Sequence, residues 1–498
     1  MAARSLRLDL AGEDASRRLG EDIAAILAPG DAILLSGDLG MGKTTLARAI
    51  IRALANDGAL DVPSPTFTLV QPYAARVPVH HFDLYRISSP DELEELGFPE
   101  ALAEGVVLVE WPERAQGALP TDAVRIALSE HGEGRRADIS GPNAFLARLE
   151  RSLAIRGFLD ASGFEGASRR FLTGDASARA YETVTAAGRT PVILMDSPRR
   201  PDGPPIRDGL PYSRIAHLAE SVVPFVAIAR ALRDEGFAAP EIFAADLDRG
   251  LLLVENLGTE GILDAGRRPV AGRYVAAAEL LAEMHAKTWP RRIAVAPGVE
   301  HEVPAYDRGA LAIETELVLD WYMPHQAGRK PDAAERAAWA AAWGAVFDRL
   351  DGGETTLVLR DYHSPNLIWR AERQGPDRPG PIPFQGAGIG PAAYDVASLA
   401  MDARVDISPG LERGVVDAYC AARGAQGGFD RASFEAAYAA MAAQRNSKIL
   451  GIFVRLNLRD GKPGYMKHLP RIRDYLSRAL AHPALADVRA FCDRAGLL

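Results

Sequence analysis

Three observations in the sequence predict an α/β protein made of two domains. An apolar run typical of a buried strand, Ala32–Leu35, leads into a glycine-rich loop, and a helical pattern over residues 46–54 follows that loop. The chain has 498 residues, which is too long for one hydrophobic core of ordinary size. We therefore expect a first domain over residues 1–150 and a second over residues 155–498, joined by a short helical segment.

The glycine-rich loop is Gly37–Thr45, and it matches G-x-x-x-x-G-K-[ST] in the strand, loop, helix setting that this pattern requires. Glycines let the backbone curl so that its N–H groups face a phosphate chain, and the positive end of the next helix points at the same charge. Lys43 is placed to reach the β- and γ-phosphates, and the Thr44 hydroxyl is placed to hold Mg²⁺. The first domain is therefore predicted to be a P-loop NTPase domain that uses ATP and Mg²⁺.

Two carboxylates stand at the ends of predicted strands. The run over residues 77–86 carries Asp83 near its end, and the run over residues 105–110 ends in Glu110. Open α/β sheets bind ligands outside the carboxyl ends of their strands. A solvated charge or a helix cap explains either acid alone equally well. Together with the loop upstream, the two acids favour a catalytic site.

Composition excludes several classes of protein. A formal net charge of −9 gives no overall attraction to nucleic acid or to anionic lipid, so any contact with RNA is expected to be local or made through partners. Two cysteines, Cys420 and Cys492, provide neither a disulfide framework nor a cysteine zinc site. The sequence shows no signal-peptide core and no apolar run of membrane-spanning length. We expect a cytoplasmic protein that does not act at a membrane.

Four motifs in the first domain resemble the TsaE family. They are Gly37–Thr45, Ser64–Phe67, His81–Arg86 and Val109–Pro112, and the resemblance covers about residues 5–145. TsaE is the small bacterial ATPase of the machinery that installs threonylcarbamoyl on the adenosine next to the tRNA anticodon. The resemblance implies ATP hydrolysis coupled to turnover of a complex with TsaD-like and TsaB-like proteins. It implies that tRNA is contacted only indirectly.

The same resemblance implies roles for single residues. Glu110 joins Thr44 as a ligand of Mg²⁺, Asp83 assists the attacking water or the metal shell, and Thr66 senses the γ-phosphate. Trp111 and Arg135 line the nucleotide, although core packing explains Trp111 equally well and a solvated side chain explains Arg135 nearly as well. The implied catalytic residues are Asp83 and Glu110. The implied ATP-binding residues are Leu39, Gly40, Met41, Gly42, Lys43, Thr44, Thr45, Thr66, Trp111 and Arg135.

The second domain contains no further loop of this type. Residues 171–196 have the pattern of a β-hairpin with a small-residue loop, which is the form in which kinase-like folds cover phosphates. Asn366 follows Asp361 after five residues in Arg360-Asp-Tyr-His-Ser-Pro-Asn366, the spacing of a kinase catalytic loop. In such a loop the aspartate orients the accepting hydroxyl and the asparagine reaches a metal ion. The spacing alone is equally consistent with an ordinary turn between strands.

Several further motifs resemble the aminoglycoside phosphotransferase fold, which is two-lobed and protein-kinase-like. We expect its small lobe at about residues 155–258 and its large lobe at about residues 259–498. The motifs most resemble the branch of kinases that phosphorylate the anomeric hydroxyl of N-acetylmuramate and N-acetylglucosamine. They are Gly174–Ser177, Met195–Pro198, Glu255–Gly258, Arg360–Leu367, Gly390–Leu399 and Gln444–Phe453. By this resemblance the second domain takes an amino-sugar ligand, Asp361 is catalytic, and Gly174, Ser177, Glu255 and Asn366 contact the nucleotide.

The chain departs from that family at two places. Met195 occupies the strand position that carries the ATP-contacting lysine in most kinases. The family has Ile-Asp-Phe-Gln-Asp-Ala where this chain has Ile-Pro-Phe-Gln-Gly-Ala, so Pro383 and Gly386 replace two aspartates, and the first of these is a metal ligand. Phosphoryl transfer depends on positioning and on neutralisation of charge by the metal. We therefore expect a domain that binds nucleotide or sugar but transfers phosphate poorly.

Two alternatives remain open for the second domain. In one, it is an active amino-sugar kinase and the chain is bifunctional. In the other, it is a binding module that senses a cell-wall sugar and influences the ATPase. A nucleic-acid-binding protein is the weakest alternative, because the chain is acidic and has no basic runs interleaved with aromatic residues.

Overall fold

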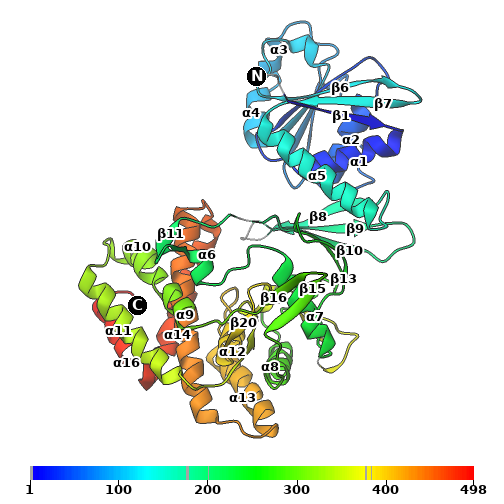
Figure 1. Ribbon diagram of the computed structural model, residues 1–498. Coiled ribbons are helices and arrows are strands. Elements are labelled where there is room, and N and C mark those ends of the chain that lie inside the picture. The colour runs from blue at the N-terminus through cyan, green and yellow to red at the C-terminus, as the bar shows by residue number, and fades with distance from the viewer. Residues whose placement is uncertain (1–3, 175–178, 200, 376–377, 383) are drawn as a thin grey trace. The chain divides into compact units, whose positions relative to one another are not determined.

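The computed structural model describes residues 4–174, 179–199, 201–375, 378–382 and 384–498 (Figure 1). The chain forms two compact units. The first contains Met1–Ser197 with Leu251–Leu253, and the second contains Pro198–Gly250 with Val254–Leu498. Among the described residues, no helix combines the length and the apolar character that a bilayer crossing requires.

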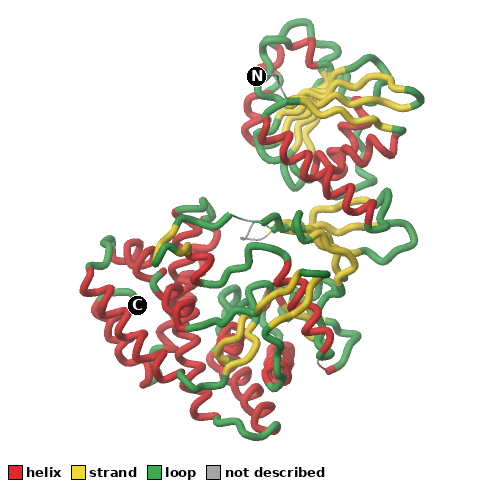
Figure 2. Tube along the Cα trace, viewed as in Figure 1, coloured by secondary structure: helices red, strands yellow, loops and turns green. Residues whose placement is uncertain are grey.

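A seven-stranded sheet is the centre of the first unit (Figure 2). Its strand order is β1-β7-β6-β2-β5-β4-β3, and β2, in the middle, runs parallel to both of its neighbours. Strand β4 runs parallel to β5, so the carboxyl ends of β2, β4 and β5 lie at the same edge. The strands are β1 (Ser5–Leu10), β2 (Ala32–Ser36), β3 (Val70–Tyr73), β4 (Val79–Asp83), β5 (Val106–Glu110), β6 (Val124–His131) and β7 (Gly134–Ser140).

Helices cover both faces of this sheet, because its central strands are apolar on both sides. Ile33 and Leu35 of β2 pack with the helices α1, α2 and α5, and Leu34 packs into a separate cluster with α3 and α4. Helices α1 and α2 approach closely at Gly20, where a Cβ atom would lie 2.5 Å from that of Ala49. The helices are α1 (Glu13–Ala24), α2 (Lys43–Ala55), α3 (Glu92–Glu95), α4 (Phe98–Glu104) and α5 (Asn143–Ala161), with a 3-10 turn η1 (Pro112–Ala115).

Helix α5 is longer than the short helical join expected from the sequence, and it leads into a second sheet. Strands β8 (Ser168–Gly174), β9 (Ala180–Thr185) and β10 (Val192–Asp196) pair in antiparallel order, which confirms the predicted hairpin. Leu251–Leu253 of β14 (Leu251–Val254) lies next to β10 in this sheet. Residues 175–178, the centre of the hairpin loop, are outside the described residues.

A buried ionic cluster fastens this second sheet to α1. Arg169 of β8 donates to Asp22 of α1 over 2.7 Å and pairs with both carboxylate oxygens of Glu182 on β9. It also donates to the backbone carbonyl and the hydroxyl of Ser152 on α5. Arg156 of α5 donates to the same carboxylate of Asp22 over 2.8 Å. We call these five residues the Arg169 cluster; each is at least nine-tenths buried.

The second unit is mostly helical. Its helices are α6 (Tyr212–Ile215), α7 (Val223–Asp234), α8 (Ala271–His285), α9 (Arg308–Thr315), α10 (Met323–Ala327), α11 (Ala333–Leu350), α12 (Ala393–Ala400), α13 (Pro409–Ala425), α14 (Arg431–Leu458), α15 (Leu469–Ala479) and α16 (Ala486–Arg494), with the π-helical turn η2 (Val318–Tyr322) and the 3-10 turns η3 (Ser364–Asn366), η5 (Pro463–His468) and η6 (Pro483–Leu485). Its strands are β11 (Pro205–Arg207), β12 (Leu210–Pro211), β13 (Ile242–Asp246), β15 (Arg292–Ala296), β16 (Val299–Glu302), β17 (Thr355–Val358), β18 (Leu367–Trp369), β19 (Pro379–Pro381) and β20 (Gly388–Pro391).

Two short antiparallel pairs position the catalytic-loop motif in this unit. Strand β17 pairs with β20, and β18 pairs with β19. Residues 359–366 connect β17 to β18, so both ends of the loop are fixed by strand pairing. Helix α14, of 28 residues, is the longest element and packs against α9, α12 and α15.

Candidate functional site

The loop between β2 and α2 has the backbone that a phosphate-binding loop requires. Gly37, Gly40 and Gly42 have φ angles of 136°, 81° and 96°, a region that side chains with a Cβ rarely adopt. At Gly37, a Cβ atom would also lie 2.4 Å from the carbonyl oxygen of Leu128 on β6. The glycines are therefore needed both for the curl of the loop and for its close approach to the sheet.

Lys43 begins α2 and folds back over this loop. Its Nζ donates to the carbonyl oxygens of Gly37 and Asp38 over 2.7 and 2.9 Å. The same nitrogen lies 3.7 Å from the centre of the Trp111 ring, and burial lowers the pKa of Lys43 below its ordinary value. Trp111 itself has a positive φ of 58° where β5 ends, and its ring packs on that of Tyr85 at 5.1 Å. Trp111 therefore lies against the lysine of the loop, and its contact with a nucleotide stays a prediction.

Thr44 and Glu110 are in direct contact. The Thr44 hydroxyl donates to Glu110 Oε2 over 2.9 Å, and the other carboxylate oxygen of Glu110 lies 2.9 Å from Nε2 of His81. Glu110 and His81 are 2% and 0% exposed. A carboxylate in this environment is held in one orientation by its two partners.

Asp83 lies beside Glu110, because the two are aligned in the register of β4 and β5. Its Oδ2 accepts hydrogen bonds from the hydroxyls of Ser64 and Thr66 over 2.6 and 2.7 Å. The backbone N–H of Tyr85 donates to Oδ1 over 3.0 Å. The predicted γ-phosphate sensor, Thr66, is therefore joined to the predicted catalytic carboxylate by a hydrogen bond.

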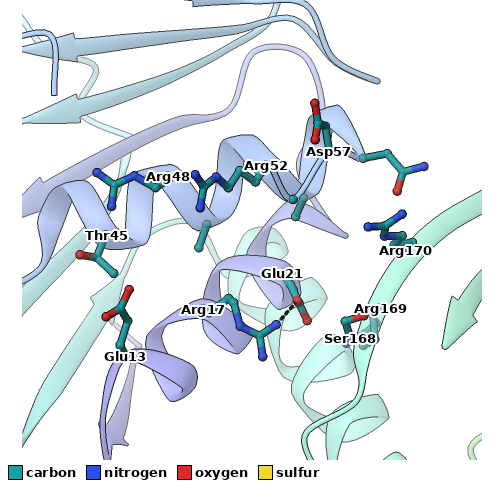
Figure 3. Close-up of a pocket in the computed structure, with 14 residues that line it drawn as sticks. Glu13, Arg17, Glu21, Thr45, Arg48, Arg52, Asp57, Ser168, Arg169 and Arg170 are labelled. Carbon is teal, nitrogen blue, oxygen red and sulfur yellow. Dashed lines mark hydrogen bonds and ion pairs between the residues drawn. The ribbon is translucent and has the colours of Figure 1, made fainter. Parts of the chain in front are cut away.

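Other predicted ATP-binding residues are placed differently. Gly40, Met41 and Gly42 belong to the loop, whereas the Leu39 side chain is 81% exposed. Thr45 contributes to a cavity of about 260 Å³ that is lined by residues of α1, α2 and β8, several of them arginines, and that does not include Lys43 among its lining residues (Figure 3). Arg135 lies near the start of β7, and its guanidinium donates to the carbonyl of Gly134 over 2.9 Å.

The sequence motifs included two further residues of this site without assigning a role to either. His81 lies two residues before Asp83 on β4, so strand alternation puts both on one face of the sheet and indicates its proximity to Glu110. Ser64 lies two residues before Thr66, and nothing in its local pattern indicated that it would share the carboxylate of Asp83.

The oxygen atoms of Thr44, Glu110 and Asp83 are the type of ligand that Mg²⁺ prefers, so these residues fit a Mg²⁺–nucleotide complex. Within the part of the chain that the structure describes, no three His, Cys, Asp or Glu side chains gather to hold an ion by themselves. Coordination by one or two protein groups together with phosphate oxygens is the ordinary arrangement for Mg²⁺.

In the second unit, the catalytic-loop motif forms a turn that hydrogen bonds hold in place. Asn366 Nδ2 donates to the carbonyl oxygen of Asp361 over 2.8 Å. The backbone N–H groups of Leu359 and Arg360 donate to the carboxylate of Asp395 on α12, over 2.5 and 2.9 Å. Burial raises the pKa of Asp395 to about 7, even though these two donors favour its charged form.

The Asp361 side chain is exposed and remains available to a ligand. The surrounding protein tends to raise the pKa of this carboxyl, but the positive field of His363, Lys448 and Arg445 outweighs that effect and lowers it. The loop therefore presents an ionised carboxylate, as a group that orients an acceptor hydroxyl must be.

The structure supports the other residues predicted to contact the nucleotide in the second domain less clearly than Asn366. Glu255 uses its carboxylate within the protein, accepting from the Glu241 N–H over 3.2 Å and from Arg233 over 3.4 Å. Gly174 ends β8, and Ser177 lies outside the described residues. Met195 is buried in β10.

The two described carboxylates that contact the backbone of this loop, Asp395 and Asp402, do not replace the second metal ligand of the kinase-like fold. Pro383 is outside the described residues, and Gly386 has no side chain to offer. The carboxylates of Asp395 and Asp402 are both engaged: Asp402 accepts from the Ser364 N–H and from the Tyr274 hydroxyl. The described residues therefore do not fit a second carboxylate-held metal ion in this lobe.

Two family models match the chain. Residues 10–137 match TsaE, the threonylcarbamoyl adenosine biosynthesis protein, and residues 168–435 match the phosphotransferase enzyme family. The chain belongs to both families. The two resemblances and the predicted fold class, a P-loop domain followed by a kinase-like domain, are thereby confirmed.

Curated relatives agree with this division. An N-acetylmuramate/N-acetylglucosamine kinase from Caulobacter vibrioides is 38% identical over 357 residues, which cover 69% of this chain and 96% of that protein. A tRNA threonylcarbamoyladenosine biosynthesis protein TsaE from Rickettsia felis is 38% identical over 130 residues, which cover 26% of this chain and 75% of that protein. This protein is therefore a TsaE-type domain fused to a phosphotransferase-type domain.

Proposed function

We propose that the TsaE-type domain binds and hydrolyses Mg²⁺-ATP in support of threonylcarbamoyladenosine formation on tRNA, with TsaD-like and TsaB-like proteins as partners. The observation that carries this proposal is the contact between Thr44 and Glu110 at the mouth of the loop, with Asp83 alongside. It is the arrangement by which P-loop enzymes hold the metal and position water.

In this proposal each residue has a defined task. The ammonium of Lys43 leaves its bonds to the loop carbonyls and pairs with the phosphates, while Thr44 and Glu110 hold Mg²⁺. The metal, when bound, neutralises charge on the phosphates. Asp83 is fixed on both carboxylate oxygens, and it orients the attacking water and accepts its proton.

For the phosphotransferase-type domain, we propose binding of an amino sugar related to N-acetylmuramate or N-acetylglucosamine, with inefficient phosphoryl transfer. Support comes from the braced, charged Asp361 and from the anchored Asn366, which favour a preserved acceptor site. The missing carboxylates at positions 383 and 386 argue against efficient turnover. The second candidate is a bifunctional chain with an active amino-sugar kinase, which the relative from Caulobacter vibrioides favours.

The experiment is an assay of the purified full-length chain with Mg²⁺-ATP, with and without each sugar. Lys43→Ala is expected to lower release of free phosphate by about 100-fold or more, because the charge that stabilises the transferred group is lost. Asp361→Ala and the exposed control Lys287→Ala should leave that release unchanged. Hydrolysis that survives Lys43→Ala would contradict the ATPase proposal.

Formation of sugar phosphate decides the second part. If it forms rapidly and only Asp361→Ala abolishes it, the bifunctional alternative is correct. If neither sugar is phosphorylated, but one binds and protects the chain against thermal unfolding, the binding proposal holds.

A further inference from the structure

Helix α14 carries an unusual run of buried polar residues in its middle. Residues 444–447 are Gln, Arg, Asn and Ser, and their exposed fractions are 0%, 4%, 0% and 0%. They begin the Gln444–Phe453 motif, to which the proposed function assigns no role. Buried polar groups are costly unless they have partners, so a run of this kind requires an explanation.

Two of these residues have a structural explanation. Gln444 donates to the carbonyl of Leu311 and to the buried carboxylate of Glu314. Asn446 donates to the carbonyl of Ala442, one turn earlier in α14. These contacts hold α14 against α9 and within its own backbone.

Arg445 is different, because its charge has no close counterpart. Among the described residues, its one hydrogen bond runs from Nη1 to the carbonyl of Met401 over 3.4 Å, and no carboxylate lies within ion-pair distance. Other arginines with similar burial are compensated. Arg360, also 4% exposed, is 2.6 Å from Glu314, and Arg169 contacts Asp22 and Glu182.

Arg445 lies close to the catalytic loop. It donates to the carbonyl of Met401, and the next residue, Asp402, accepts from the Ser364 N–H of that loop. The positive charge of Arg445 contributes to lowering the pKa values of Asp361 and His363. Two buried polar atoms of the same loop, His363 Nδ1 and Ser364 Oγ, make no hydrogen bond to the described residues, although Nδ1 lies 4.0 Å from a carboxylate oxygen of Asp402. A buried guanidinium with one long hydrogen bond thus lies close to the loop that carries the exposed carboxylate of Asp361.

We propose that Arg445 receives an oxyanion of the ligand beside Asp361. Guanidinium groups bind carboxylates and phosphates through two parallel hydrogen bonds, and a bound anion would balance the buried charge. The oxyanion has two sources, the carboxylate of an acidic acceptor sugar or a phosphate of the nucleotide. The sugar source rests on the amino-sugar part of the proposed function, and there Arg445 would distinguish N-acetylmuramate, which is acidic, from neutral N-acetylglucosamine.

The test measures binding by calorimetry of N-acetylmuramate, N-acetylglucosamine and Mg²⁺-ATP to the full-length chain. All variants carry Lys43→Ala, so that ATP reports on the phosphotransferase-type domain. We expect Arg445→Met to weaken binding of N-acetylmuramate at least tenfold, which is the usual effect of losing a charged hydrogen bond. Binding of N-acetylglucosamine should weaken less than twofold. If the oxyanion is a phosphate, ATP binding weakens tenfold and sugar binding does not change.

Two further variants control for structure. Arg445→Lys keeps the charge but not the two parallel donors, and should give an intermediate loss. Arg455→Met removes another arginine of α14, which lies 5.3 Å from the ring of Tyr212, and should change none of the three affinities.

Two outcomes would overturn the proposal. In the first, Arg445→Met leaves all three affinities unchanged. In the second, it lowers all three equally together with the melting temperature, which would make Arg445 a counter-charge for the loop aspartates. A parent chain that binds neither sugar overturns the amino-sugar function instead, and the ATP measurement then decides the role of Arg445.

Discussion

Glu314 shows how burial and pairing set the charge of a single side chain. It is fully buried, and one oxygen lies 2.6 Å from Arg360 and 2.8 Å from Lys448. The other oxygen accepts from Tyr306 and Gln444. Burial alone would raise the pKa of its carboxyl, but the charges of Lys448 and Arg360 outweigh burial and lower that pKa to about 2.

Stability in acid should therefore depend on Glu314. Its pKa is about 2 in the folded protein and about 4.5 when unfolded, so its contribution is complete above pH 4.5 and is lost as the pH falls toward 2. We expect Glu314→Gln to remove this part of the pH dependence and to lower the free energy of unfolding by about 3–5 kcal/mol at pH 7, because two buried cations lose their anion. Urea unfolding at pH 7, 4 and 3 measures both effects. Equal stability of variant and wild type at pH 7 would refute the expectation.

At the scale of elements, α14 depends on a close contact at Gly451. A Cβ atom there would lie 2.3 Å from the carbonyl oxygen of Leu317, the residue that precedes η2. Neither group can move without shifting a buried backbone segment. Glycine is therefore required by packing at this position, although it is unfavourable in a helix interior.

Gly451→Ala should destabilise the protein by about 1–3 kcal/mol, the usual cost of overpacking. Gly414 of α13 provides the matched control, because a Cβ atom there meets nothing within 4 Å. Gly414→Ala should raise the free energy of unfolding by about 0.5–1 kcal/mol through helix propensity. Thermal unfolding compares the two variants, and changes of the same sign would be inconsistent with this account.

Elements with a strong local pattern could be predicted from the sequence. The strand, loop and helix around Lys43 follow from periodicity and glycine spacing. An alternating strand pattern before Asp83 and a buried apolar run before Glu110 placed these two residues at the same edge. The length of α5 could not be predicted, because its buried face includes polar residues such as Arg156, which hide the helical period. The partners of Arg445 and Arg169 depend on residues distant in sequence, so no local pattern reveals which arginine is paired.

At the scale of the whole molecule, the first unit joins parts of two families in one compact body. The Arg169 cluster lies where they meet, since Asp22 is in the range matched by TsaE and Glu182 is in the range matched by the phosphotransferase family. The boundary predicted at residues 150–155 falls within α5, which supplies Ser152 and Arg156 to this cluster.

Arg169→Met should therefore destabilise the TsaE-type part and the phosphotransferase-type part of the first unit together. It removes the arginine that pairs with the buried carboxylate of Glu182 and one of the two arginines that pair with Asp22, and we expect the free energy of unfolding to fall by about 3–5 kcal/mol. Amide hydrogen exchange should become faster in α1 and in β9, which are far apart in the sequence. The neighbouring exposed Arg170 is the control, and Arg170→Met should change stability by no more than about 0.5 kcal/mol. Faster exchange in only one of the two segments would show that they are not coupled.

The Arg169 cluster also constrains how this protein can evolve. Loss of the carboxylate at position 22 would remove the anion that Arg156 and Arg169 share in the interior, so a substitution there should favour compensating changes in the other part. In lineages that carry both parts on one chain, positions 22, 169 and 182 should therefore covary. In lineages with two separate proteins, position 22 is released from that joint selection.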